Sequence, residues 1–169
     1  MAVMGEEPKF AADRMLGRLA RWLRLLGVDV LWQPNLGGHE LLRLARSQGR
    51  VMLTRDSRLR TARDVLPMES NFLREQLRDV LLACPFDPRN RTFSRCSRCN
   101  APLRPLARDV VFHQVPLYVY ASHERFFWCD QCGRIYWEGT HQQRMRDEIE
   151  RLMRLIGADS GADKTSTAG

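Results

Sequence analysis

The segment RVMLTRD, residues Arg50–Asp56, sets the expected architecture of this 169-residue chain. Its apolar core, Val51–Leu53, follows a glycine and runs into a polar turn. A short apolar run between turn signals is typical of a strand buried on both faces, as in a parallel sheet covered by helices. Such sheets place their sites at the carboxyl ends of the strands. Asp56 is therefore the first candidate functional residue.

A second candidate strand, Lys9–Ala12, leads directly into Asp13. Parallel strands of one sheet end at the same edge, and neighbouring strands lie about 4.8 Å apart. We therefore expect the carboxylates of Asp13 and Asp56 to converge closely enough to share a divalent cation, directly or through water. Each aspartate also has a simpler interpretation, as the N-cap of the helix that follows it.

Helical and strand patterns alternate through the first half of the chain, which favours βαβ units around a mostly parallel sheet. Helices are expected at about 14–26, 40–48 and 71–82 with a short one at 57–63, and further strands at 28–33 and 64–69. The helix after Asp13 is amphipathic, and Arg14, Arg18 and Arg21 share the face opposite its apolar stripe. That face is either a phosphate-binding surface or simply solvated.

The composition changes after CPFDPRNRTF at 84–93, where we place a domain boundary. Beyond it, β-branched and aromatic residues predict strands at 110–121, 125–128 and 134–137, and helix formers predict a helix at about 142–156. The expected organisation is an α/β domain over 1–88, a small β-rich unit with the last helix over 89–156, and a disordered tail over 157–169.

Four of the five cysteines form two CxxC pairs, Cys96 with Cys99 and Cys129 with Cys132. Each CxxC turn places two sulfurs on one edge of a tetrahedron, so the two pairs complete a closed four-thiolate zinc site. Redox-active or free thiols are the alternative. A closed site leaves no position for water, so this zinc is expected to be structural. The fifth cysteine, Cys84, is expected to be a small buried residue.

The net charge of +7 comes almost entirely from arginine, because Lys9 and Lys164 are the only lysines. Arginine suits bidentate phosphate contacts and favours a nucleic-acid partner, with a codon bias toward arginine as the alternative. No apolar run is long enough to span a membrane. The first ten residues lack the pattern of a signal peptide, so we expect a cytoplasmic location.

Four segments carry a family likeness: FAADRMLGRLARWLRLLGVDV at 10–30, GRVMLTRDSRL at 49–59, RCSRCNAPL at 95–103 and CDQCGRIYWEGTH at 129–141. In this order they resemble the Mut-seven C-terminal RNase family, a PIN-like nuclease domain followed by a zinc ribbon. The resemblance covers roughly 10–154. It implies an α/β, PIN-like three-layer sandwich with a mostly parallel sheet, followed by a small β-rich zinc ribbon and a C-terminal helix. The activity it implies is metal-dependent cleavage of RNA.

By position, the resemblance makes Asp13 and Asp56 the acids of the metal site. PIN-like enzymes commonly add an acid at the start of the helix before the TRD strand, where this chain has Gly38, His39 and Glu40. Glu40 or His39 is expected to serve instead. Further candidates for an outer acid are Asp29 and Asp79.

The implied chemistry uses Mg²⁺ or Mn²⁺, hard cations that carboxylates bind. Such an ion acidifies a water for attack on phosphorus and neutralises charge on the phosphate. The arginines expected to orient the RNA backbone are Arg14, Arg18, Arg21 and Arg55. Tyr136 and Trp137 are expected either to stack on unpaired bases or to pack in the ribbon core. The rival functions are a non-catalytic RNA-binding adaptor and a protein-interaction module.

Overall fold

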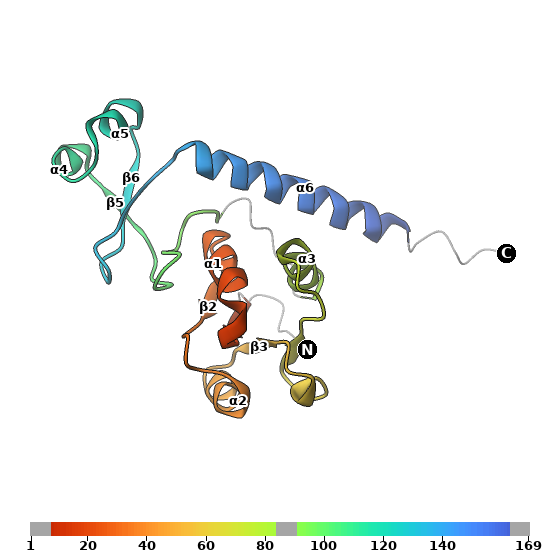
Figure 1. Ribbon diagram of the computed structural model, residues 1–169. Coiled ribbons are helices and arrows are strands. Elements are labelled where there is room, and N and C mark those ends of the chain that lie inside the picture. The colour runs from red at the N-terminus through yellow and green to blue at the C-terminus, as the bar shows by residue number, and fades with distance from the viewer. Residues whose placement is uncertain (1–7, 84–90, 163–169) are drawn as a thin grey trace.

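A four-stranded parallel sheet forms the centre of the first half of the chain (Figure 1). The computed structural model describes residues 8–83 and 91–162, without the side chains of 140–142 and 156–162. In spatial order the strands are β2 (Asp29–Leu31), β1 (Lys9–Ala12), β3 (Val51–Thr54) and β4 (Val65–Pro67). All three pairings are parallel, which confirms the predicted α/β class.

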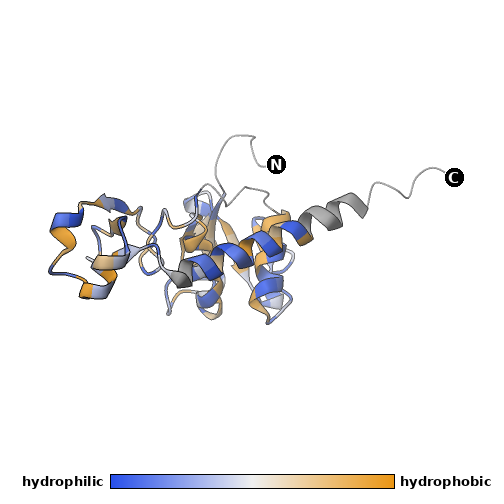
Figure 2. Ribbon diagram, turned by 90° about the horizontal axis from the view of Figure 1, so that it is seen from above, coloured by the Kyte–Doolittle hydropathy of each residue, from blue (hydrophilic) through white to orange (hydrophobic). Residues whose placement is uncertain are grey.

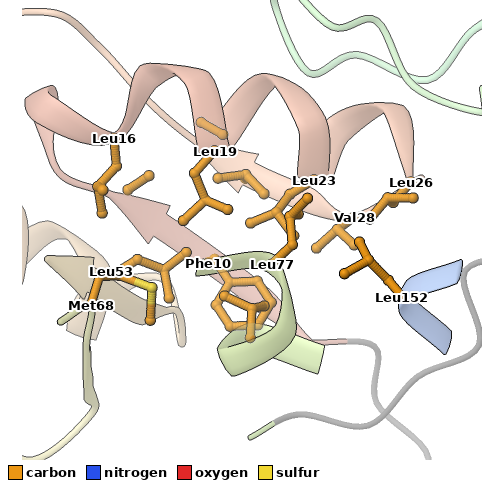
Figure 3. Close-up of a cluster of buried hydrophobic side chains, with 14 of the residues drawn as sticks. Phe10, Leu16, Leu19, Leu23, Leu26, Val28, Leu53, Met68, Leu77 and Leu152 are labelled. Atoms are coloured by element: carbon orange, nitrogen blue, oxygen red, sulfur yellow. The ribbon is translucent and has the colours of Figure 1, made fainter. Parts of the chain in front are cut away.

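Helices cover both faces of this sheet and make three layers. The helices are α1 (Gly17–Leu25) and α3 (Leu73–Ala83) on one face and α2 (Gly38–Ser47) on the other. Successive strand residues point to opposite faces, so Phe10 packs toward α1 and α3 while Ala11 packs toward α2. Figure 3 shows Phe10 and Leu53 of the sheet against Leu19 and Leu23 of α1.

The start of the first helix is tighter than the sequence predicts. A 3-10 turn, η1 (Arg14–Leu16), precedes α1. Gly17 follows this turn, and a Cβ there would collide with the ring of Trp32. The missing side chain therefore lets the first helix approach the end of β2 closely.

The prediction of a short helix at 57–63 is wrong. The structure has only the 3-10 turn η2 (Ser57–Leu59) before β4 begins at Val65. Parallel strands joined by a helix need a connection of about a dozen residues or more, and β3 and β4 are neighbours joined by residues 55–64 alone. The link is too short to complete a packed helix.

The second unit contains a small antiparallel sheet in the order β5 (Arg104–Leu106), β6 (Phe126–Trp128) and β7 (Ile135–Trp137). The strands expected at 125–128 and 134–137 are thus confirmed. The sequence analysis missed β5, because Pro105 is unfavourable in a strand. Proline is tolerated there because β5 is an edge strand.

The prediction of a strand at 110–121 is wrong. These residues form two short helices, α4 (Arg108–Val111) and α5 (Leu117–Ser122). Val111 of α4 and Val119 of α5 are buried in one cluster with Phe126, and Val115, from the link between the two helices, packs against it. This shared burial is met by two short helices, and it outweighs the β propensity of the individual residues.

The last helix, α6 (Thr140–Ala162), returns to the first unit and lies across α1 and α3 (Figure 2). Its Ile149 and Leu152 are buried in the same core as Leu26 of the α1 C-terminus. The helix continues beyond the predicted end near Ile156. The end of the expected tail, 163–169, lies outside the described residues, as do most of the expected boundary segment and Cys84.

Docking of α6 predicts a large difference between two leucines three residues apart. Leu152 is 2% exposed, whereas Leu155 is 51% exposed. Leu152→Ala should lower the free energy of unfolding by about 2–5 kcal/mol through lost burial and the cavity left behind. Leu155→Ala should change it by roughly 0.5 kcal/mol or less. Urea unfolding measures both, and equal losses would contradict the docking of α6.

Candidate active site and metal centre

A cavity of about 360 Å³ opens at the carboxyl ends of β1 and β3. Its lining residues are Asp13, Arg14, Met15, Gly37, Gly38, Arg55, Asp56, Ser57 and Arg58. The two aspartates that the topology predicts to converge therefore face one cavity. We call it the acid cavity.

Asp13 is buried, with 2% of its surface exposed. Its Oδ1 accepts a hydrogen bond from the N–H of Arg14 at 2.7 Å, and its Oδ2 accepts one from the hydroxyl of Thr54 at 2.6 Å. Both donors are neutral. Asp13 thus caps the η1 turn, as its simpler interpretation predicts, and also presents a carboxylate to the acid cavity.

Asp56 is held by one neighbour, Arg58. Its Oδ1 accepts from Arg58 Nε at 2.9 Å and its Oδ2 accepts from Arg58 Nη2 at 2.7 Å, a bidentate pair. The backbone N–H of Arg58 also donates to Oδ1, so Asp56 caps η2. These hydrogen bonds hold the pKa of Asp56 at about 2. The carboxylate is therefore ionised at any physiological pH.

Thr54 connects the two aspartates. Its hydroxyl donates to Asp13 and accepts a hydrogen bond from the N–H of Asp56 at 3.0 Å. Sequence reasoning assigned Thr54 no role. The available signal was its position as the last residue of β3, directly before the candidate acid.

Glycines occupy the place where a third acid was expected. A Cβ at Gly37 would collide with Oδ1 of Asp13, and Gly38 adopts a left-handed φ of 59°. Glu40, in the first turn of α2, is exposed and does not line the acid cavity. His39 lies close enough to contribute weakly to the lowered pKa of Asp56. Over the described residues, the acids here form no cluster of three potential metal ligands.

The other two candidate acids lie elsewhere. Asp29 pairs in register with Lys9 at the opposite end of the strands, where Arg50 binds it at 2.7 Å. Asp79 lies on α3, where burial raises its pKa. Neither lines the acid cavity.

The four cysteines of the CxxC pairs gather in the second unit. Their sulfurs all lie within 4.8 Å of one another, with Cys96 Sγ 3.7 Å from Cys132 Sγ and Cys99 Sγ 3.2 Å from Cys129 Sγ. Four sulfurs bound to zinc at about 2.3 Å in a tetrahedron lie about 3.8 Å apart. The cluster is therefore placed to hold one zinc ion.

The two CxxC turns have the same backbone design. In each, the residue after the second cysteine adopts a left-handed conformation, Asn100 with φ 70° and Gly133 with φ 69°. Its N–H donates to the carbonyl oxygen of the first cysteine, at 2.9 Å in one turn and 2.8 Å in the other. The matched turns aim both sulfur pairs at one point.

Ionisation of the cluster needs a compensating charge. Burial opposes the thiolate of Cys96, but hydrogen bonds, that from the Tyr136 hydroxyl first, hold its pKa at about 6. Burial and then the neighbouring Cys129 raise the pKa of Cys99 to about 12. Several thiolates this close repel one another unless a bound cation compensates them, which suits a metal site.

A family model for the Mut7-C RNAse domain matches residues 8–149, which span both units. The chain belongs to this family. Comparison with curated proteins and with solved structures gives no match. The Mut7-C assignment confirms the resemblance seen in the sequence and indicates a nuclease-like function with RNA as the substrate class. Over the described residues, no helix is both long and apolar enough to cross a membrane.

The Mut7-C arginines divide between two places. Arg14 and Arg55 line the acid cavity, together with Arg58, which sequence reasoning missed. Its signal was its spacing two residues after Asp56, within the turn that Asp56 caps. Arg18 and Arg21 lie further along α1, outside this cavity.

The cysteine geometry predicts about one zinc ion per purified chain. Cys99→Ser should lose most of this zinc and destabilise the second unit, because a structural zinc contributes folding free energy. Cys84→Ser should keep the zinc, because Cys84 belongs to neither CxxC pair. Elemental analysis of protein kept free of chelators measures the content, and zinc-free wild type would contradict the site.

The Asp56–Arg58 pair predicts a pH effect. The folded pKa of about 2 lies below the ordinary value of about 3.9, so the pair stabilises the fold fully above pH 4 and loses its effect as pH falls toward 2. Arg58→Ala should raise the pKa of Asp56 toward its ordinary value, as read from an NMR titration of the carboxyl carbon. Arg60→Ala is the matched control, because Arg60 pairs with Glu69 instead. An unmoved pKa in Arg58→Ala would contradict the assignment.

Proposed function

We propose that this chain is a metal-dependent ribonuclease that cleaves RNA phosphodiester bonds in the acid cavity. The observation that carries the proposal is the carboxylate of Asp13, which is buried beside Asp56 and, among the described residues, is hydrogen-bonded only to neutral donors. A buried carboxylate without a positive partner is costly, and a bound cation compensates it.

Two carboxylates fit the requirements of Mg²⁺ or Mn²⁺. Magnesium in phosphoryl-transfer sites keeps several waters and takes one or two carboxylates together with substrate phosphate oxygens. Asp13 and Asp56 would hold it, and Glu40, being exposed outside the cavity, could act only through water. When bound, such an ion acidifies a water and neutralises charge on the phosphate.

In this proposal, neighbouring residues hold the two acids and position the substrate. Thr54 fixes the carboxylate of Asp13, and Arg58 fixes that of Asp56. Arg14 and Arg55 are exposed on the rim and supply donors for a phosphate. The chain's own groups thus orient the backbone of the RNA against the two acids.

We also propose that the cysteine cluster holds a structural zinc ion in a ribbon that aids RNA binding. Four thiolates saturate a tetrahedral ion and leave no position for water. Thiolate sites of this kind persist where cysteines stay reduced, which supports a cytoplasmic location. The proposed division remains a nuclease domain over 1–88 and a ribbon with the last helix over 89–156.

A non-catalytic RNA-binding adaptor is the second candidate function. The specific observation in its favour is that Arg58 already neutralises Asp56, while no third acid completes the cluster over the described residues. An adaptor would bind RNA and leave it intact.

Cleavage of a mixed RNA pool with Mg²⁺ or Mn²⁺ separates the two functions. Asp13→Asn and Asp56→Asn should each lower the rate by more than the roughly 10–100-fold typical of losing an outer-shell partner, because each removes a proposed ligand. Asp79→Asn is the control, since Asp79 lies outside the cavity. Circular dichroism and zinc content establish that each variant is folded. Metal-dependent cleavage that survives both substitutions would overturn the site, and binding without cleavage by wild type would favour the adaptor.

A further inference from the structure

A second hollow, of about 590 Å³, lies between α1, the end of β2, the first CxxC turn and α6. Its lining includes Arg18, Arg21, Trp22, Trp32 and Arg98. We call these five residues the arginine–tryptophan groove. A neighbouring hollow of about 370 Å³ shares Arg21 with it and extends to Tyr136 and Trp137 of the ribbon.

The cations of this groove are uncompensated. The side chains of Arg18, Arg21 and Arg98 are exposed, and among the described residues none of them forms a hydrogen bond or an ion pair. In the part of the chain that the structure describes, no acid lines either hollow. Arg24 also lines this hollow, but it is buried, and its guanidinium already donates to backbone carbonyl oxygens. Free guanidinium groups without acids favour an anionic ligand, and phosphate matches their geometry.

The tryptophans of the groove are held in place before any ligand binds. The indole N–H of Trp32 donates to the carbonyl oxygen of Arg14 at 3.2 Å, and its ring packs against Gly17 so tightly that a Cβ would collide with it. Trp22 packs against the apolar core from α1 while lining the groove. Fixed aromatic rings beside arginines are the arrangement on which unpaired bases stack.

The groove continues from the acid cavity along one helix. Asp13, Arg14 and Met15 line the acid cavity, and the groove lining begins at Gly17. From there α1 runs nine residues, about 13 Å, toward the first CxxC turn. A chain of several nucleotides can therefore contact both places at once.

We propose that the arginine–tryptophan groove is a subsite for single-stranded RNA flanking the cleaved bond, with phosphates on Arg18, Arg21 and Arg98 and unpaired bases on the tryptophans. The proposal rests on the proposed function, because it extends the substrate path of the same site. It selects single strands, because bases in a duplex are stacked on one another and do not reach a side-chain ring.

The test is equilibrium binding of a fluorescein-labelled oligouridylate of roughly twelve nucleotides, without added Mg²⁺ or Mn²⁺, so that cleavage plays no part. Arg98→Ala should weaken binding about tenfold and make the slope of log K against log salt shallower by about 0.7, as expected for one lost phosphate contact on a single strand. The Arg98 side chain has no partner among the described residues, and its carbonyl, which Arg24 binds, remains. Arg43→Ala is the matched control and should bind as wild type does, because Arg43 is exposed on α2, which covers the other face of the sheet from α1.

Stacking is tested separately at Trp32. Trp32→Leu keeps an apolar side chain but should weaken binding by roughly fivefold or more, whereas Trp32→Phe should retain most of the affinity, since a ring remains. Quenching of tryptophan fluorescence on binding gives an independent readout. Urea unfolding of both variants excludes a loss of fold as the cause.

The outcomes separate this proposal from the proposed function. The groove is overturned if Arg98→Ala binds like Arg43→Ala with an unchanged salt slope, if an RNA duplex of equal length binds as tightly as the single strand, or if wild type binds no RNA. Groove-dependent binding by a wild type that cleaves nothing would sustain the subsite and overturn the nuclease. If Asp13→Asn abolishes cleavage while RNA binding is unaffected by the groove substitutions, the nuclease is sustained and the subsite is overturned.

Discussion

A carboxylate buried at the end of a strand needs hydrogen bonds on both oxygens, and Asp13 obtains the second one only if two strands end together. Its Oδ2 takes the hydroxyl of Thr54 at the end of β3, while its own N–H donates to the carbonyl of Leu53 at 2.9 Å. The parallel register of β1 and β3 thus places Thr54 against Asp13, the buried acid of the cavity. This arrangement requires glycine at position 37, because a Cβ there would collide with the carboxylate of Asp13.

A second constraint joins the ribbon to the sheet. β2 is an edge strand, and an open edge leaves backbone groups unpaired. Val30 donates its N–H to Asn100 Oδ1 at 3.1 Å, and its carbonyl accepts from Arg24 Nε at 2.9 Å. Arg24 also donates to the carbonyls of Ser97 and Arg98, inside the first CxxC turn. The cysteine turn therefore covers the sheet edge, so that order in the second unit and order in the first unit support each other.

The parts of the site that the sequence predicted correctly are those that depend on strand topology or on fixed residue spacing. The convergence of Asp13 and Asp56 follows from parallel strands, and the four-cysteine cluster follows from two equal turns. The strand expected at 110–121 failed because β propensity was weighed alone, whereas the burial of Val111 and Val119 against Phe126 is met by two short helices. Arg58 was missed for another reason: its pairing depends on a side-chain rotamer in a three-residue turn, which no period in the sequence records.

The two acids of the cavity are unequal, and this inequality bears on how the site works. Asp13 is buried and has no ion pair among the described residues, whereas Asp56 pairs with Arg58, whose side chain is 83% exposed. Exposed ion pairs contribute little to stability, because water and salt screen them. In the proposed nuclease, the exposed Arg58 side chain is therefore the partner that gives way when a cation or a phosphate enters the cavity. The buried acid of the site is thus Asp13, and the acid whose partner can exchange is Asp56. This accounts for a cavity that carries two acids and three arginines in its lining without being a closed salt-bridge network.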